Sequence, residues 1–513
     1  MSNIVDYEDG TLAVGRMAAE RNDTVDRGTY WTFFDGSIWL PMRKVEQARR
    51  GWSNLSALFD GRSVTVSSSA HEVNIDSRKG AGMWTSTITG FVSGTSAIEP
   101  SLVIDGRDNI FVVSTTIGKI LGVGNPKQVA TSRDKGVTWS HQILWPDTTF
   151  RKPQFAAGDQ AADSFGDKIA VAIAETFGDV HLWESFDNGF AWTYRNLTNY
   201  SDRIPMGEKE SRPAGSADAL YDHNGSVHVF WETYLAVPDT SGAAIEFYES
   251  EEVGIHHWSE ATGEKEIVVW ADIPGAEREA EHTLWAGGSF FDQTGVDGDL
   301  IAQPQAGVDA EGNLYLLFAS FRPLDFDADS AHYTDIYALG SKDGGKTWGS
   351  IVNVTDSPQS EDLWASLADN IGDSLRFVYQ SDGSTGNSIQ GGGEAPTTVL
   401  YYAFPKSKIP LERTSVADGY SNRKIPTAFA LRQNYPNPFN PSTTIRFDLP
   451  EAGHVSLKVF NLLGNEVMTL VDEHQSEGAH QVELDGASMQ SGVYLCRLQA
   501  GSFSQAIKVT LLK

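Results

Sequence analysis

The chain has 513 residues, of which 40% are hydrophobic and 11% aromatic, and this composition excludes a globally disordered protein. Its 68 acidic and 39 basic residues give a formal charge of −29, which argues against binding to nucleic acid or to an anionic membrane surface and favours an extracellular or periplasmic protein. No apolar run is long enough to span a membrane, and the single cysteine, Cys496, excludes an intrachain disulfide and a cysteine-rich metal module.

The N-terminal residues 1–28 are expected to form an extension before the first strands. They have neither a basic segment nor an apolar segment of the kind that a signal peptide carries, so no export signal is expected there. A hairpin follows at residues 30–39. Its Thr32, Gly36 and Trp39 are a weak copy of a motif that recurs further along the chain.

Three octets share the pattern S-x-D-x-G-x-x-W. In each octet the Asp can tie a turn by accepting backbone N–H bonds, the Gly allows positive φ, and the Trp can pack between sheets. We therefore expect structural roles for the motif residues Ser132, Asp134, Gly136, Trp139, Ser185, Asp187, Gly189, Trp192, Ser341, Asp343, Gly345 and Trp348. Weaker copies that end at Trp39, Trp84 and Trp258 extend the series to six hairpins.

A second motif precedes these hairpins: an apolar strand, a turn with Asp and Gly, and another apolar strand. Clear copies span residues 101–113, 217–231 and 306–318, and looser copies begin near Leu55, Phe155 and Leu367. Joined to the octet hairpins, they make six four-stranded units. The sequence thus predicts an all-β, six-bladed β-propeller over residues 29–408, in which the N-terminal hairpin completes the last blade.

The octets resemble the Asp box, or BNR repeat, of sialidase-like β-propellers. This resemblance implies a secreted or cell-surface protein that recognises or processes an extracellular, acidic glycan. The alternative is a non-catalytic binding, adhesion or surface-scaffold protein, because a propeller hosts all of these functions. For an enzyme, the resemblance implies a glycoside hydrolase, with a polysaccharide lyase as the second choice.

The chain changes character after Pro410. Residues 409–426 are polar and without periodicity, which is typical of a linker, and residues 427–513 alternate short strands with Gly and Pro turns, which predicts a small Ig-like β-sandwich. The run Asn434-Tyr-Pro-Asn-Pro-Phe-Asn-Pro441 and the later Ser491-Gly-Val-Tyr494 resemble the type A C-terminal sorting domain of the type IX secretion system of Bacteroidota. The resemblance implies export, attachment at the outer surface or cleavage of the domain, and the secretion machinery as a partner.

Candidate site residues follow from the propeller topology, since the first strands begin and the second strands end on one face. Arg50, Arg151 and Arg212 precede or begin three first strands, and together they could bind a carboxylate or sulfate group of a substrate. The alternative is that they pair with glutamates around the channel mouth: Glu99, Glu210 and Glu361. The candidate catalytic residues, none identified by a motif, are Glu232, Tyr234, Tyr379, Asp382 and His71. In the lyase alternative, His71 or His282 together with Tyr234 could act as base and acid.

The alternating carboxylates Asp325, Asp327 and Asp329 have the spacing of a calcium loop but lack its Gly and terminal Glu. They form either a solvated loop or a structural Ca²⁺ site, and no other metal or cofactor is expected. The expected partners are an extracellular glycan or a surface protein, with the chain itself a monomer.

Overall fold

The computed structural model describes the following residues: 3–7, 9–18, 27–51, 53–68, 71–91, 96–117, 119–120, 123–124, 126–144, 160–175, 178–198, 200, 204, 210–238, 245–248, 254–276, 301–326, 332–384, 397–413, 429–431, 434, 437, 439, 441–450, 453–461, 464–475, 478–487, 489–501 and 503–512. The chain divides into two compact units, Met1–Ala417 and Asp418–Lys513. The described residues are almost entirely β-strands, with short 3-10 turns at η1 (Trp270–Asp272) and η4 (Lys406–Lys408).

Seven sheets, numbered here 1 to 7, follow one another through the described part of the first unit, and their strands pair antiparallel apart from one short parallel pair in sheet 6. Sheets 1 to 3 contain β1 (Ile4–Asp6), β2 (Leu12–Ala18), β3 (Gly28–Phe34) and β4 (Arg43–Lys44); β5 (Asn54–Ala57), β6 (Ser63–Ser67), β7 (Glu72–Asp76) and β8 (Trp84–Ile88); and β9 (Ser96–Ile104), β10 (Ile110–Ile117), β13 (Lys127–Ser132) and β14 (Ser140–Leu144). A small ribbon, β11 (Lys119–Ile120) with β12 (Val123–Gly124), extends from sheet 3.

The later sheets have the same plan. Sheets 4 and 5 contain β15 (Gln160–Phe165), β16 (Lys168–Ala174), β17 (Val180–Ser185) and β18 (Thr193–Asn196); and β19 (Glu210–Tyr221), β20 (Val227–Pro238), β21 (Ile245–Tyr248), β22 (Gly254–Ser259) and β23 (Gly263–Val269). Sheets 6 and 7 contain β24 (Ile301–Asp309), β25 (Leu314–Phe326), β26 (His332–Ser341), β27 (Val352–Asn353) and β29 (Asn370–Ile371); and β28 (Glu361–Leu367), β30 (Ser374–Asp382) and β31 (Thr398–Pro405).

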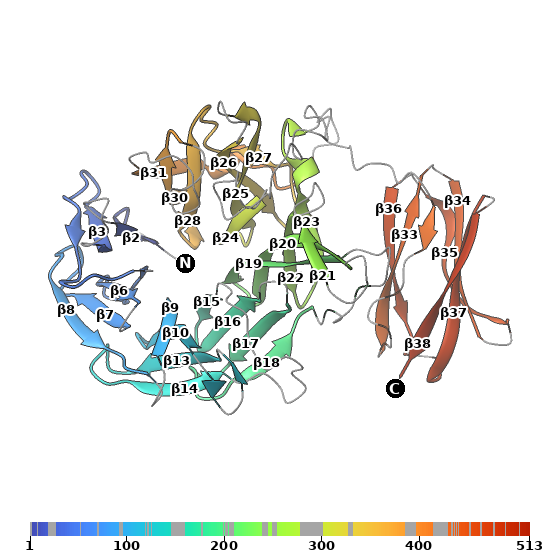
Figure 1. The fold of residues 1–513 in the computed structure, drawn as a ribbon, viewed down its shortest axis with the longest axis horizontal. Helices are drawn as coiled ribbons and strands as arrows, with labels where there is room; N and C mark the ends of the chain where they lie inside the picture. Colours follow the sequence, from blue (N-terminus) through green and yellow to red (C-terminus); the bar gives the residue numbers. More distant parts are fainter. Residues whose placement is uncertain are drawn as a thin grey trace. The chain divides into compact units, whose positions relative to one another are not determined.

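The first strands of the sheets surround a common centre. β1 contacts β5, β5 contacts β9, and the contacts continue through β15, β19, β24 and β28. Figure 1 shows the sheets as blades around this centre. Such radial repetition leaves only short inner edges, and the all-β propeller predicted from the repeats is confirmed.

The number of sheets and the closure of the ring differ from the prediction of six blades. The N-terminal hairpin does not complete the last sheet: β3 pairs with β2 and β4, and β2 pairs with β1, so residues 4–18 supply the inner strands of a seventh sheet. A short copy of the strand-turn-strand motif, with Asp9 and Gly10 in its turn, was the available signal. Hairpin patterns identify local pairs, whereas non-local packing decides which sheet a hairpin joins.

Sheet 1 packs directly against sheet 7 and closes the ring. Their contact, called here the seam, contains the apolar side chains Ile4, Val14, Ala368 and Val378. The backbone N–H of Asn3 also donates to Ser366 Oγ at 2.8 Å. The first and last sheets share no strand among the described residues, so side-chain packing and a few polar bonds hold the seam.

The three octets form the same hydrogen-bonded turn. Ser132 Oγ donates to Asp134, whose carboxylate accepts the N–H groups of Val137 and Thr138 at 3.1 and 2.8 Å. The other two octets repeat this arrangement around Asp187 and Asp343. The three octet glycines have φ values of 84°, 79° and 81°, and the octet tryptophans pack into the apolar clusters between sheets. The carboxylates therefore bind their own turns.

The second unit contains two sheets that share one apolar core. One is formed by β32 (Ala430–Leu431), β33 (Ser442–Leu449) and β36 (Gly478–Asp485), and the other by β34 (Gly453–Phe460), β35 (Glu466–Gln475), β37 (Gly492–Ala500) and β38 (Phe503–Leu511). Cys496 lies in this core as a free thiol, and burial raises its pKa to about 12. The thiol is therefore a packing group at neutral pH.

Candidate functional site

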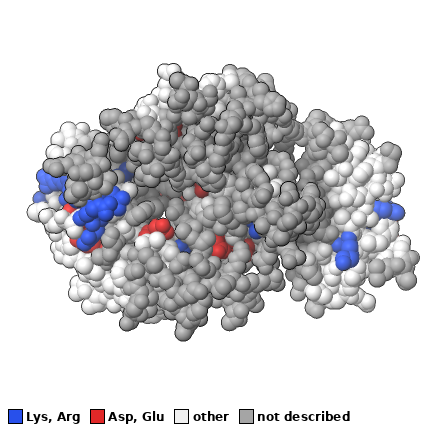
Figure 2. Space-filling model, viewed as in Figure 1, with Lys and Arg blue, Asp and Glu red and all other residues white. Residues whose placement is uncertain are grey.

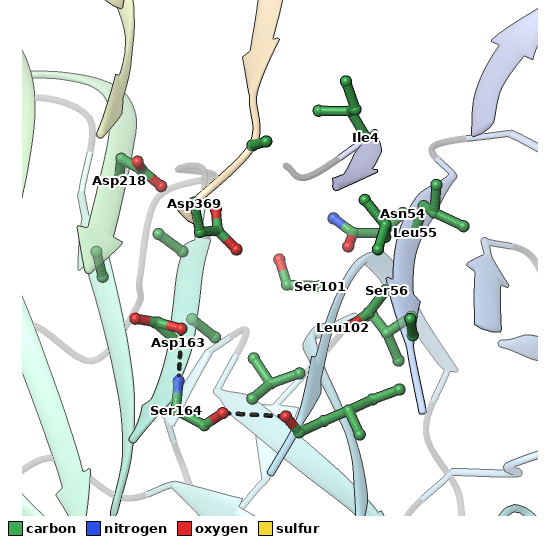
Figure 3. A pocket seen from close by; sticks show the side chains of 18 of the residues that line it. Ile4, Asn54, Leu55, Ser56, Ser101, Leu102, Asp163, Ser164, Asp218 and Asp369 are labelled. Carbon is green, nitrogen blue, oxygen red and sulfur yellow. Dashed lines mark hydrogen bonds between the residues drawn. The ribbon is translucent and has the colours of Figure 1, made fainter. Parts of the chain in front are cut away.

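A polar cavity of about 210 Å³ lies among the inner strands of the ring. Figure 3 shows Asp163, Asp218 and Asp369 on one side of it, opposite Asn54. Inner strands are sheet edges, so their N–H groups have no strand partner on the channel side. Asp163 accepts the N–H of Tyr221 at 2.6 Å, and Asp218 accepts the N–H of Ala306 at 2.6 Å. Each carboxylate thus accepts a backbone N–H group that the next inner strand around the ring would otherwise leave without a partner.

Burial inside the ring makes these three carboxyls weak acids. It raises the pKa of Asp163 to about 7 and that of Asp218 to about 6. Asp369 is exposed toward the channel but surrounded by the ring, and this enclosure together with the nearby Asp163 and Asp218 raises its pKa to about 8. The cavity therefore retains protons near neutral pH.

The described residues contain no group of three or more His, Cys, Asp or Glu side chains that could hold a metal ion. Of the predicted calcium loop, Asp325 accepts the N–H of Gln359 at 2.9 Å and lies 3.4 Å from Arg322, while Asp327 and Asp329 lie outside the described residues.

The face where the first strands begin, called here the entry face, has an irregular backbone. The pairings of β9, β19, β24 and β28 with their neighbours each shift register there. Glu99, Gln303 and Trp364 adopt φ values of 52°, 58° and 50° on three of these strands. Strained, bulged backbone of this kind is common beside functional sites.

The candidate catalytic residue Glu232 holds this irregular backbone in place through hydrogen bonds. It is buried, and its two oxygens accept the N–H groups of Ser216 and Gln303 at 3.0 and 2.8 Å. Both oxygens therefore hold bulges of neighbouring inner strands. This makes Glu232 a positioning group in the described structure.

The other candidates on second strands have different surroundings. Tyr234 is buried beside Arg212, its cross-strand partner. Burial raises the pKa of Tyr379 to about 12, and Asp362 adds to this effect. Asp382 accepts the N–H of Ser384 at 2.9 Å and the hydroxyl of Thr397 at 3.1 Å. These contacts identify no acid–base pair.

His71 lies directly before Glu72, the first residue of β7, and the other candidate base, His282, lies outside the described residues. Arg50 pairs with Glu72, the residue after His71, with Nη2 2.7 Å from Oε2. His71 is buried at a φ of 46°, and its Nε2 has no hydrogen-bond partner among the described residues. Burial lowers the pKa of His71 to about 4, with a smaller contribution from His141, so the ring is neutral at physiological pH.

The two predicted arginines that the structure describes, Arg50 and Arg212, lie in different surroundings. Arg212 is buried, donates through Nε and Nη2 to Glu210 at 3.0 and 2.8 Å, and lies 5.5 Å from the Tyr200 ring centroid. This matches the alternative of an Arg–Glu pair. Arg50 pairs with Glu72, which was not among the predicted glutamates, and Arg151 lies outside the described residues.

The sequence reasoning missed two arginines beside Arg50. Arg27 Nε donates to the Arg50 carbonyl oxygen at 3.3 Å, and the Arg50 N–H donates to the Arg27 carbonyl at 2.9 Å. Burial and the nearby charge of Arg49 lower the pKa of Arg27. Figure 2 shows Lys and Arg side chains gathered over the first sheets and acidic side chains nearer the ring centre. The pair Arg49-Arg50 in an acidic chain was the available signal.

Residues 433–511 match the family model described as the secretion system C-terminal sorting domain. The match confirms the predicted sorting domain and indicates secretion, attachment at the cell surface and interaction with the secretion machinery. No helix in the described part of the chain has the length and apolar character to span a membrane. No curated protein matches the chain.

Several solved structures resemble the chain at low identity. An ulvan lyase of family PL25 bound to -[GlcA(1-4)Rha3S]- is 11% identical, with 80% of this chain and 92% of that chain covered and a TM-score of 0.48. A GH93 α-L-arabinofuranosidase of Fusarium graminearum with arabinobiose is 11% identical, with 70% and 94% covered and a TM-score of 0.37. A leech intramolecular trans-sialidase with 2,7-anhydro-Neu5Ac is 12% identical, with 70% and 68% covered and a TM-score of 0.38. Likeness at this level says nothing of substrate or activity.

Proposed function

We propose that this exported surface protein binds an anionic extracellular glycan on the entry face of sheets 1 and 2. The observation that carries the proposal is the arginine cluster, defined as Arg27, Arg49 and Arg50, in a chain whose formal charge is −29. Guanidinium groups bind carboxylate and sulfate groups through paired N–H donors. A surface-attached protein encounters such groups on extracellular polysaccharides.

The cluster has electrostatic features that suit an anionic ligand. Arg49 is exposed, while Arg27 and Arg50 are partly buried. A ligand can therefore reach Arg49 from solvent, and the surrounding residues restrict the other two side chains. The charge of Arg49 lowers the pKa of Arg27, which means that two positive charges repel each other there. A bound polyanion would relieve this repulsion. Glu72 pairs with Arg50 at the base of the cluster.

Binding to polysaccharides tests this proposal. The full chain is titrated with a uronate-rich polymer, a sulfated polymer and a neutral polymer of similar length. Arg49→Gln with Arg50→Gln is the test variant, and Arg62→Gln is the matched control, because Arg62 pairs with Asp60 in the turn that follows β5. We expect tight binding to one or both anionic polymers, with at least a tenfold loss in the test variant. Equal binding of the neutral polymer, or no loss in the test variant, would contradict the proposal.

Catalysis is a second candidate, favoured by the neutral, strained His71 next to the Arg50–Glu72 pair. In uronate β-elimination, a base takes the C5 proton, the C5–H electrons form the C4–C5 double bond, and the glycosidic oxygen leaves with its bonding pair. His71 Nε2 is buried in this structure, so it would take the proton only after a local opening exposes it, while an arginine neutralises the uronate carboxylate. Ultraviolet absorbance of the new double bond tests this step. If the polymer binds but the absorbance does not rise, the protein binds the glycan without cleaving it.

A further inference from the structure

Arg16 lies in the seam between the first and last sheets of the ring. It is the one charged residue of the apolar strand β2 and is only 5% exposed. Its Nη2 donates to the Trp364 carbonyl oxygen at 2.9 Å. With the Gln380 amide turned so that its oxygen faces Arg16, that oxygen accepts from Nη2 and Nε at 3.1 and 3.0 Å. The guanidinium is thus held on two nitrogens by neutral groups of sheet 7.

The third nitrogen of this guanidinium is unsatisfied. Within the part of the chain that the structure describes, Arg16 Nη1 has no hydrogen-bond partner, and no carboxylate pairs with the side chain. Other buried or partly buried arginines are paired: Arg50 with Glu72, Arg212 with Glu210 and Arg376 with Asp6. Burial lowers the pKa of Arg16 to about 10, which leaves the group charged at neutral pH. A buried charge without a counterion is costly.

The backbone that holds Arg16 is itself strained. Trp364, at φ 50°, donates its N–H to the side-chain oxygen of Gln303, at φ 58°. Gln303 in turn is held by Glu232. Two left-handed non-glycine residues therefore sit within one or two hydrogen bonds of the unpaired guanidinium. Strain of this kind persists where the surrounding structure fixes a functional geometry.

We propose that the seam is a binding site for a carboxylate group of the uronate type, with Arg16 Nη1 as the charged donor. The group would supply the missing counterion and accept the free N–H bonds of Nη1. Nη1 has no exposed surface, so the ligand enters when sheets 1 and 7 separate locally. Sheets 1 and 7 share no described strand, so this separation would break side-chain packing and a few polar bonds and no strand pairing. This inference rests on the proposed function in one respect: the carboxylate is taken to come from the anionic glycan proposed there.

Thermal unfolding of the full chain tests this site. The probes are sodium glucuronate, glucose, sodium sulfate and NaCl, with the ionic strength of the salts matched. We expect glucuronate to raise the Tm of the wild type by about 2 °C or more beyond NaCl, and glucose to leave it unchanged. The same rise is expected in the Arg62→Gln control. A rise with sulfate of equal size shows that the site takes free inorganic anions as well, which overturns its assignment to a carboxylate.

The Arg16→Met variant separates this proposal from a structural role. Because it removes an unpaired buried charge, we expect its Tm without ligand to equal or exceed that of the wild type, and its response to glucuronate to vanish. A much lower Tm, or a chain that does not fold, shows that Arg16 is structural and overturns the proposal, as does an unchanged glucuronate response. Arg16→Lys, which keeps a charge but not the planar donors, should show a smaller response. The polymer titration tests the site at Arg49 and Arg50, whereas the glucuronate Tm shift tests the seam. Either measurement can therefore contradict its own hypothesis without affecting the other.

Discussion

Asp6 and Arg376 join the two ends of the ring through a bidentate contact, with Arg376 Nη1 2.9 Å from each carboxylate oxygen. Asp6 ends the first strand, and Arg376 lies in β30 of the last sheet. Burial raises the pKa of Asp6 even though Arg376 opposes the shift. The cost of burying this carboxylate therefore offsets much of the attraction, and the ion pair orients the seam more than it stabilises it.

The apolar residues of the seam should contribute more stability than this ion pair. Ile4 is 2% exposed within the seam cluster, and Ile4→Ala should cost about 2–4 kcal/mol because it leaves a cavity. Asp6→Asn should cost about 1 kcal/mol or less. Urea unfolding of both variants measures the difference. A larger loss for Asp6→Asn than for Ile4→Ala would show that charge holds the ring closed.

Removal of an octet carboxylate should destabilise its turn. Asp343 accepts the N–H and hydroxyl of Thr347 and the hydroxyl of Ser341. Asp343→Ala should cost about 1–3 kcal/mol because these donors lose their acceptor, and Asp343→Asn should cost less because it keeps one oxygen. Lys346→Ala, at an exposed position of the same turn, is the control for urea unfolding. Glycan binding should not change, since the turn lies on the face opposite the arginine cluster.

The channel carboxyls should make the ring less stable as the pH rises. Asp369 has a pKa of about 8 in the folded protein, against an ordinary value of 3.8 in the unfolded chain. Between these values the unfolded chain has lost the proton that the folded chain keeps, so stability falls with rising pH and levels off above about pH 8. Asp369→Asn removes this penalty.

Urea midpoints at pH 5 and pH 9 measure this effect. Asp369→Asn should raise the midpoint more at pH 9 than at pH 5. Asp373→Asn, at an exposed position before β30, should change neither value. An equal gain at both pH values would mean that the proton on Asp369 plays no part.

Neutralising Glu72 should strengthen glycan binding. Glu72 lies 2.7 Å from Arg50 and offsets its charge, so Glu72→Gln leaves the cluster more positive. We expect about two- to fivefold tighter binding to an anionic polymer and a steeper loss of affinity with salt, whereas Arg50→Gln should weaken binding. Glu311→Gln, in the turn after β24 where Glu311 pairs with Lys406, is the control. Weaker binding by Glu72→Gln would show that Arg50 needs its partner to hold a binding geometry.

Local chemistry explains what the sequence could predict. Asp134 and Gly136 close a turn within one octet, and the sorting-domain motif is a continuous run around Asn434. Such signals need no knowledge of distant residues, so the repeated hairpins, the propeller class and the C-terminal domain could all be predicted. The seventh sheet was missed because the short hairpin around Gly10 lies in the region predicted to be an N-terminal extension, and because the last sheet has no octet of its own.

The candidate sites depend on contacts that the sequence does not encode locally. Arg16 bonds to Trp364 across 348 positions, and Arg27 reaches the Arg50 carbonyl only because the loops before β3 and β5 lie side by side. Sequence alone determined that hairpins form and which turn residues close them, since these bonds span a few residues. Only the tertiary structure decided how many sheets surround the channel and which charges remain unpaired, because ring closure and burial arise from packing between distant strands.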